Sequence, residues 1–151
     1  MAEITLREVT RDNWRPLALL SRGLPPDQQR YVAHNAISML DAYYGDGAFT
    51  QVGVYVGEQP VGYVLYGLDR ETRQWWIIRV MIAHGEQGKG YGRAAMQQVI
   101  ERLRATPGCD AIFISFVPEN QAARALYESL GFVDTGEVEE GELVFRLALR
   151  T

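Results

Sequence analysis

The chain has 151 residues, of which 47% are hydrophobic and 23% charged, and its formal net charge is −4. This length and composition predict a single folded domain over residues 1–151 with a sizeable core, and exclude a disordered chain. The negative charge argues against nucleic acid as a general partner, because binding phosphates requires a basic surface. It suits a cationic substrate, although mild acidity also serves solubility alone.

The sequence carries no signal for a membrane, for secretion or for a metal. It has no run of 18 apolar residues, and its first ten residues include three charged side chains. We therefore expect a cytoplasmic protein without a membrane partner. The single Cys109 cannot form an intrachain disulfide, and it fits a small near-core residue better than a catalytic thiol. His34 and His84 lack the neighbouring ligands of a zinc site, so we expect no metal.

The first half of the chain predicts a strand, two helices and a β-hairpin. Apolar and polar residues alternate over residues 4–9, as in an opening strand. A short helix to Leu20 follows, and a second helical stretch covers about residues 27–43. Residues 51–56 and 61–68 predict two strands joined by a tight turn. The apolar residues expected on one side of the second helix are Val32, Ala36, Met39 and Leu40.

The second half alternates strands with helices and closes on another hairpin. Residues 75–82 form an apolar run that is typical of a buried strand. Apolar residues at helical spacing then predict a long helix that ends before Pro107. A strand over residues 111–116, a helix after Asn120 and a hairpin over residues 132–149 complete the chain. The apolar positions of the long helix are Met96, Val99, Ile100 and Leu103.

A glycine-rich turn, QGKGYG at residues 87–92, lies between the fourth strand and the long helix. Such a turn presents backbone N–H groups and the positive end of the helix dipole, which together can bind phosphate. Glycine lets an anion approach the backbone, although the same residues could form only a tight turn. The spacing does not fit a P-loop or the dinucleotide fingerprint G-x-G-x-x-G. It does match the acyl-coenzyme A loop Q/R-x-x-G-x-G/A at Gln87, Gly90 and Gly92.

A second motif lies further along the chain. The segment NQAARALYESLGF, residues 120–132, resembles the N-x-x-A-x-x-x-Y-x-x-x-G-F motif of the GNAT acyl-CoA N-acyltransferase superfamily. The two motifs occur in the order and at the separation expected for that family, and they cover about the C-terminal half of the chain. Residues 31–44 are similar to the second helix of bacterial spermine/spermidine (diamine) N-acetyltransferase-like members.

The resemblance implies an α/β (α+β) GNAT fold, with a mixed, strongly twisted sheet of six to seven strands and about four flanking helices. In this fold the sheet splays open between strands 4 and 5. The pantetheine arm of acetyl-CoA, the implied cosubstrate, enters the gap and covers an open strand edge that is otherwise a liability. The residues that the resemblance assigns to coenzyme binding are Val80, Met81, Ile82, Gln87, Gly88, Lys89, Gly90, Tyr91, Gly92, Arg93, Asn120 and Tyr127.

The resemblance also implies a mechanism, in which the acyl group passes directly to an amine in a ternary complex. Tyr127 corresponds to the family's general acid, since a protonated phenol can donate to a departing thiolate. A backbone N–H near Met81 is expected to polarise the thioester carbonyl. The structural alternative is that Asn120 only caps its helix and Tyr127 is a half-buried aromatic residue.

The sequence does not identify the group that takes a proton from the amine. Relatives that acetylate polyamines often have carboxylates on the fourth strand, where this chain has Ile78 and Ala83. A primary amine with a pKa of about 10.4 is neutral in only about one molecule in 10³ at pH 7, so proton removal matters. His84 follows the strand and is a candidate, although it equally fits a turn residue.

The N-terminal half is expected to select the acceptor, a small-molecule amine such as spermidine or spermine. Aspartates at positions 27, 41 and 46 could attract a polycation, but a solvated helix face explains them equally well. A homodimer is the family default. Two other functions stay open, a protein or peptide N-acetyltransferase and a non-catalytic acyl-CoA-binding regulatory domain. The candidate substrate-binding residues are Tyr31, Asn35, Ser38 and Asp41.

Overall fold

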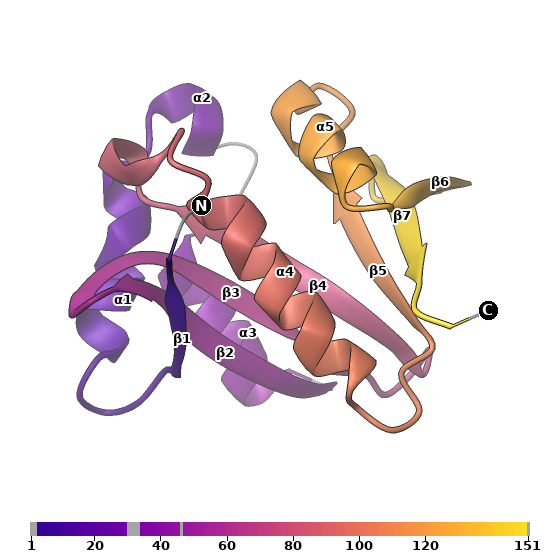
Figure 1. Ribbon diagram of the computed structural model, residues 1–151, viewed down its shortest axis with the longest axis horizontal. Helices are drawn as coiled ribbons and strands as arrows, with labels where there is room; N and C mark the ends of the chain where they lie inside the picture. The colour runs from indigo at the N-terminus through magenta and orange to yellow at the C-terminus, as the bar shows by residue number, and fades with distance from the viewer. Residues whose placement is uncertain (1–2, 30–33, 46, 151) are drawn as a thin grey trace.

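The computed structural model describes residues 3–29, 34–45 and 47–150, and these contain one seven-stranded sheet with helices on both faces (Figure 1). The strands are β1 (Thr5–Glu8), β2 (Gly47–Val56), β3 (Gln59–Asp69), β4 (Gln74–Ile82), β5 (Ala111–Phe116), β6 (Val133–Glu139) and β7 (Glu142–Ala148). The helices are α1 (Trp14–Leu19), α2 (Pro26–Gln29), α3 (Asn35–Tyr44), α4 (Tyr91–Arg104) and α5 (Gln121–Ser129), with short 3-10 turns at Leu20–Gly23 and His84–Glu86.

The sheet has the strand order β1-β2-β3-β4-β5-β7-β6. Neighbouring strands are antiparallel except for β4 and β5, which run parallel. These two strands pair only where Trp75 meets Ile112 and Trp76 meets Phe113, and they then diverge (Figure 1). The predicted splay between strands 4 and 5 is therefore confirmed, and with it the predicted fold.

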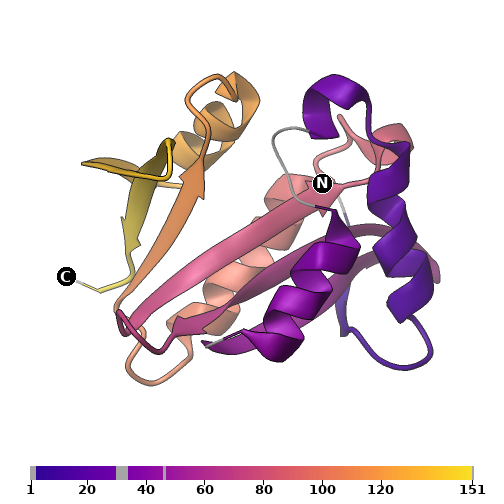
Figure 2. The ribbon, with the colours of Figure 1, turned by 180° about the vertical axis from the view of Figure 1, so that it is seen from behind.

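Helices cover both faces of the sheet, and the hydrophobic cluster is larger on one face than on the other. α4 and α5 lie on one face, and α1 and α3 lie on the other, as the view from behind shows (Figure 2). α4 buries Met96, Val99 and Leu103 in the main core, as its apolar spacing predicts. A smaller cluster around Tyr63 and Met81 lies on the other face, packed against side chains of α3. No helix among the described residues is long and apolar enough to cross a membrane.

The prediction of one helix over about residues 27–43 is wrong. The structure has two separate helices there, α2 and α3, and Val32 lies outside the described residues. The predicted apolar side is also partly wrong, because Ala36 and Leu40 are exposed and Leu40 keeps 54% of its surface in solvent. Only Met39 of that set packs against the smaller cluster.

Polar residues occupy the buried side of α3 instead. Asn35 is 1% exposed because α1 and the following turn satisfy its polar groups. Its side-chain amide donates to the Leu17 carbonyl oxygen at 2.8 Å, and its backbone N–H donates to Ser21 Oγ at 3.0 Å. These partners are 14 and 18 residues away in sequence, so helical periodicity could not reveal them.

Both predicted hairpins are confirmed. The β2–β3 turn falls at Gly57 and Glu58, and the β6–β7 turn falls at Glu140 and Gly141. In the second turn both residues have positive φ, +50° and +82°, which matches the right-handed twist of the flanking strands.

Candidate active site

The divergence of β4 and β5 opens a cleft with a volume of about 830 Å³. Its walls come from β4, the glycine turn and first residues of α4, α2, β5, the start of α5 and the first residue of β7. The structure thus brings together segments that are separated by more than half of the chain. The predicted coenzyme-binding residues that line the cleft are Val80, Met81, Ile82, Gln87, Gly88, Gly90, Tyr91, Gly92, Asn120 and Tyr127.

The edge of β4 that faces β5 presents the backbone groups of two residues to the cleft. The Ala83 N–H donates to the Val61 carbonyl oxygen on the β3 side at 2.8 Å. Since peptide groups in a strand alternate in direction, Met81 also directs its backbone toward β3, where it pairs with Tyr63. Val80 and Ile82, the two neighbours of Met81, therefore direct their N–H and C=O groups away from β3. The role of a donor near Met81 at the thioester stays a prediction.

A β-bulge at Ile78 interrupts β4 beside the cleft. Leu65 pairs with Arg79 and Tyr66 pairs with Ile77, so Ile78 has no partner residue on β3. Arg79 Nη1 donates to the carbonyl oxygen of Ile78 at 2.8 Å. Ile78 lines the cleft, and its apolar side chain therefore contributes no proton acceptor where relatives often have a carboxylate.

The glycine turn has a backbone geometry that requires glycine at two positions. Gly88 has a φ of +79° and Gly90 a φ of +83°, in the left-handed region that side chains disfavour. Gly90 is the N-cap of α4, and its carbonyl accepts the Ala94 N–H at 3.1 Å. The first N–H groups of a helix have no acceptor within it, and here they belong to Tyr91 and Gly92, which line the cleft. These donors and the helix dipole suit a pyrophosphate.

Gln87 connects the glycine turn to two neighbouring segments. Its Nε2 donates to the Ile82 carbonyl oxygen at 3.0 Å and to Gln28 Oε1 at 2.8 Å. Gln28 Nε2 donates back to Gln87 Oε1 at 3.1 Å, so the two amides are reciprocally bonded. α2 is thereby attached to the glycine turn at the cleft. The sequence analysis did not predict a role for Gln28, because its hydrogen-bond partner Gln87 is 59 residues away in the chain.

Lys89 and Arg93 lie outside the wall of the cleft. Lys89 Nζ forms an ion pair with Glu86 at 3.1 Å, and Arg93 Nη1 donates to Ser129 Oγ on α5 at 2.5 Å. Both residues line a shallow depression along α4 that adjoins the glycine turn. Their contact with coenzyme stays a prediction.

The helix α5 begins and ends as its sequence predicts. Asn120 is the N-cap, and its Oδ1 accepts a backbone N–H of the first turn at 3.2 Å. At the other end, the Phe132 N–H donates to the Tyr127 carbonyl oxygen and the Gly131 N–H to that of Glu128, both at 3.0 Å. Gly131 has a φ of +99°. This Schellman motif ends the helix and fixes Tyr127 one turn before it.

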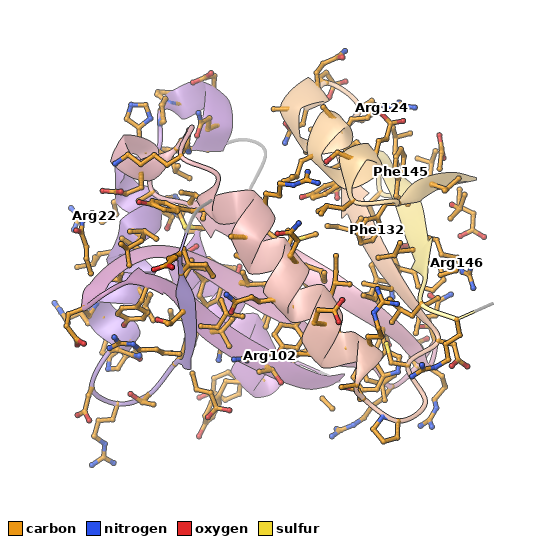
Figure 3. All side chains as sticks on the ribbon, in the orientation of Figure 1. Arg22, Arg102, Arg124, Phe132, Phe145 and Arg146 are labelled. Carbon is orange, nitrogen blue, oxygen red and sulfur yellow. The ribbon has the colours of Figure 1, made fainter. Side chains whose placement is uncertain are left out.

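Aromatic rings hold the Tyr127 side chain in place. Its ring centroid lies 5.4 Å from that of Phe116 and 6.0 Å from that of Phe132. The Phe116 ring centroid in turn lies 4.9 Å from that of Phe145. The Arg124 guanidinium lies 5.4 Å from the centroid of the Phe145 ring, and both side chains are labelled in Figure 3. Such packing restricts the phenol to one position on the cleft wall.

The surroundings keep the Tyr127 phenol protonated. Tyr127 is 9% exposed, and burial raises its pKa to about 12, with a smaller contribution from the nearby negative charge of Glu142. A neutral phenol can donate a proton at any physiological pH. Asn120 thus caps its helix, as the structural alternative predicts, and Tyr127 is a buried aromatic residue, but both residues also line the cleft.

The predicted acceptor-binding residues of α3 do not line the cleft. Tyr31 lies outside the described residues, Asn35 is engaged with α1, and Asp41 is exposed. Ser38 is buried, and its Oγ has no hydrogen-bond partner among the described residues. Of the predicted residues that the structure describes, Asn35, Ser38 and Asp41 therefore do not contribute to the lining of the cleft.

The cleft is lined by more negative than positive charge. Four carboxylates line it, from Asp27, Glu86, Glu119 and Glu142, against the single guanidinium of Arg79, counted over the described residues. Such a lining attracts cations and raises their local concentration. The sequence predicted only Asp27, because the three glutamates lie on segments whose approach to the cleft depends on tertiary structure.

Two other reactive side chains lie apart from the cleft. His84 begins the turn after β4, is exposed and does not line the cleft, so the geometry does not favour it as a base. Cys109 is fully buried, and burial raises the pKa of its thiol, which makes it unreactive. Within residues 3–29, 34–45 and 47–150, no group of three or more His, Cys, Asp or Glu side chains is arranged to hold a metal.

A sheet split beside a glycine turn, with helix-start donors on one wall and a buried phenol on another, has the groups that suit an acyltransferase. Comparison with known families agrees, since the sequence model of the "Acetyltransferase (GNAT) family" matches residues 8–132. The chain belongs to the GNAT family of acetyltransferases.

Individual relatives include enzymes named for polyamines. The chain is 30% identical to the spermine/spermidine N(1)-acetyltransferase of Bacillus subtilis, over 93% of this chain and 95% of the relative. A structure of spermidine N-acetyltransferase from Vibrio cholerae in complex with CoA and spermine aligns with a TM-score of 0.73, at 22% identity, over 95% and 92% of the two chains. The ribosomal-protein-S18-alanine N-acetyltransferase of Escherichia coli aligns with a TM-score of 0.73, at 16% identity, over 99% and 96%. Both structures share the fold.

Proposed function

We propose that the protein transfers the acetyl group of acetyl-CoA to a primary amine of a small polycation such as spermidine or spermine. The observation that carries this choice of acceptor is the excess of carboxylates in the lining of the cleft. The 30% identity to a spermine/spermidine acetyltransferase over nearly the whole chain supports the same class. The fold alone does not decide, because a protein-alanine acetyltransferase shares it.

The coenzyme fits the α4 and α5 side of the cleft. Its pyrophosphate would accept hydrogen bonds from the backbone N–H groups of Tyr91 and Gly92, at the turn where Gly88 and Gly90 leave room for it. Its pantetheine arm would pair with the outward backbone groups of Val80 and Ile82. The Ile82 carbonyl oxygen accepts a hydrogen bond from Gln87 Nε2, so the pantetheine arm would have to replace this side-chain amide to pair with Ile82.

The remaining groups support direct transfer. The amine attacks the thioester carbonyl, and the negative charge that develops on oxygen is stabilised by an outward N–H of β4, for which Val80 is better placed than Met81. As the C–S bond breaks, the Tyr127 phenol gives its proton to sulfur. The protein itself forms no acyl-enzyme.

Release of free thiol from acetyl-CoA tests the proposal. The purified protein is incubated with acetyl-CoA and a panel of spermidine, spermine, simple diamines, monoamines and peptides with free N-termini or lysines. Thiol release that depends on the polyamines supports the proposal, whereas release with peptides alone indicates a protein acetyltransferase. Binding of acetyl-CoA in calorimetry without release in any mixture indicates a non-catalytic binding domain.

A further inference from the structure

The reaction proposed above requires the amine to lose a proton, and the wall of the cleft contains a group placed to take it. Ile78 of β4 is apolar, and His84, which follows β4, does not line the cleft. Neither residue can therefore act as the base. The remaining acceptors are the four carboxylates of the lining, and their surroundings differ.

Three of these carboxylates are poorly placed for proton transfer. Glu86 forms its ion pair with Lys89 beside the glycine turn, where the coenzyme phosphates would lie. Asp27 on α2 and Glu119 in the loop before α5 are both exposed to solvent. Glu142 differs from all three, because it is partly buried at the start of β7 and accepts a hydrogen bond on Oε1 from Ser115 Oγ at 2.9 Å.

The alternation of side chains along β5 and β7 places this pair opposite the phenol. Ile114 and Phe116 of β5 pack in the main core with Tyr127, so Ser115 between them points to the other face of the sheet. On β7, Val144 pairs with Ser115, and Glu142 shares the face of Val144. The carboxylate and the phenol therefore border the same cleft from opposite faces of the sheet.

This arrangement fits a thioester that lies in the split of the sheet. The coenzyme sulfur would be reached from the α4 and α5 face, where Tyr127 lies, and the amine from the other face, where Met81 packs and Asp27 of α2 lines the cleft. Both Glu142 and Tyr127 line this cleft, so a thioester in the split would have one of them on each side.

We propose that Glu142 is the proton acceptor for the amine and that Ser115 positions its carboxylate. This inference rests on the proposed function. Glu142 takes one proton from the ammonium and passes it to solvent, and the freed lone pair forms the N–C bond while the carbonyl π pair moves onto oxygen. The oxyanion pair then re-forms the carbonyl π bond, and the C–S bond breaks with its electron pair on sulfur, which takes the Tyr127 proton. Nitrogen still carries two protons; one passes through solvent to the Tyr127 phenolate and the other stays as the amide N–H. The proton taken by Glu142 is therefore the one released per turnover.

Glu142→Gln tests this role, with Glu139→Gln as a matched control. Glu139 faces Glu142 in the same hairpin, is exposed and does not line the cleft. We expect Glu142→Gln to lower kcat for spermidine by about 10²–10⁴ at pH 7 while the Kd for acetyl-CoA stays within about twofold. The loss should shrink as the pH approaches the pKa of the amine, and it should shrink for a weakly basic amine. Glu139→Gln should behave as the wild type.

A second variant covers the case in which Glu142→Gln does not fold, as judged by its melting curve. Ser115→Ala keeps the carboxylate but removes its donor, and we expect kcat to fall about tenfold with the same recovery at high pH. Wild-type kcat in both variants, or a raised KM with unchanged kcat, overturns the inference while the proposed function stands. Equal losses for strongly and weakly basic amines also overturn it. No thiol release by the wild type overturns the proposed function and this inference together.

Discussion

Replacing Tyr127 with phenylalanine removes one oxygen atom from the cleft and leaves the aromatic packing intact. The ring contacts to Phe116 and Phe132 remain, at centroid distances of 5.4 and 6.0 Å, and so does the Schellman motif, which uses only backbone groups of this residue. We therefore expect the free energy of unfolding to change by less than about 1 kcal/mol.

The effect on turnover should be far larger. A positioned general acid contributes about 10²–10⁴ in rate, which corresponds to roughly 3–5 kcal/mol of transition-state stabilisation. Because the Tyr127 backbone and ring stay in place, the Kd for acetyl-CoA should stay within about twofold. The variant thus separates the catalytic interpretation of Tyr127 from the structural one.

Three measurements on the same preparation decide between them. Thiol release at saturating spermidine gives kcat, calorimetry gives the Kd for acetyl-CoA, and a melting curve gives stability. A kcat within about threefold of the wild type would remove Tyr127 from the mechanism, since that is less than one decade in rate. A lost melting transition would instead mean that the hydroxyl is needed for folding, contrary to the packing described above.

Other predictions concern stability and coenzyme binding. Gly88→Ala forces a side chain onto a φ of +79° and should weaken acetyl-CoA binding at least tenfold, whereas Gly85→Ala, with open space and no positive φ, should leave the calorimetric Kd unchanged. Leu103→Ala empties a site that is 1% exposed and should cost about 2–5 kcal/mol in denaturant unfolding, against less than about 0.5 kcal/mol for Leu40→Ala, which is 54% exposed. The native state keeps Tyr127 neutral to about pH 12, while the unfolded chain ionises it near pH 10. Ionisation of this phenol in the unfolded chain therefore has no effect on stability below pH 10 and lowers stability by roughly 2–3 kcal/mol as the pH rises to 12. Between pH 9 and 12 the free energy of unfolding of Tyr127→Phe should therefore fall by roughly 2–3 kcal/mol less than that of the wild type. An identical pH dependence of the two proteins would contradict the raised pKa of Tyr127.

Features that depend on the local backbone were predictable from the sequence. Gly131 ends α5 because a left-handed residue is needed there, and Phe132 then returns to the core. Asn120 caps the same helix for an equally local reason. The glycine turn was recognisable because positive φ at Gly88 and Gly90 is a demand that few other residues meet.

Features that depend on distant partners were not predictable. The buried face of α3 contains Asn35, a polar residue that helical periodicity alone would assign to the solvent side. Its burial depends on the hydrogen bond from its side-chain amide to the Leu17 carbonyl oxygen, 18 residues away. The reciprocal pair of Gln28 and Gln87 has the same origin. The sequence predicted Glu142 only as part of the closing hairpin, and the pairing of β7 with β5 is what brings it to the cleft.

The limited pairing between β4 and β5 has a consequence for the lifetime of the protein. Across that junction only Trp75–Ile112 and Trp76–Phe113 join the two parts of the described sheet. A pantetheine arm lying along β4 would complete the missing backbone contacts, and a ligand at 100 times its Kd stabilises the native state by about 2.7 kcal/mol. Resistance to proteolysis would then depend on the fraction of the protein that has coenzyme bound.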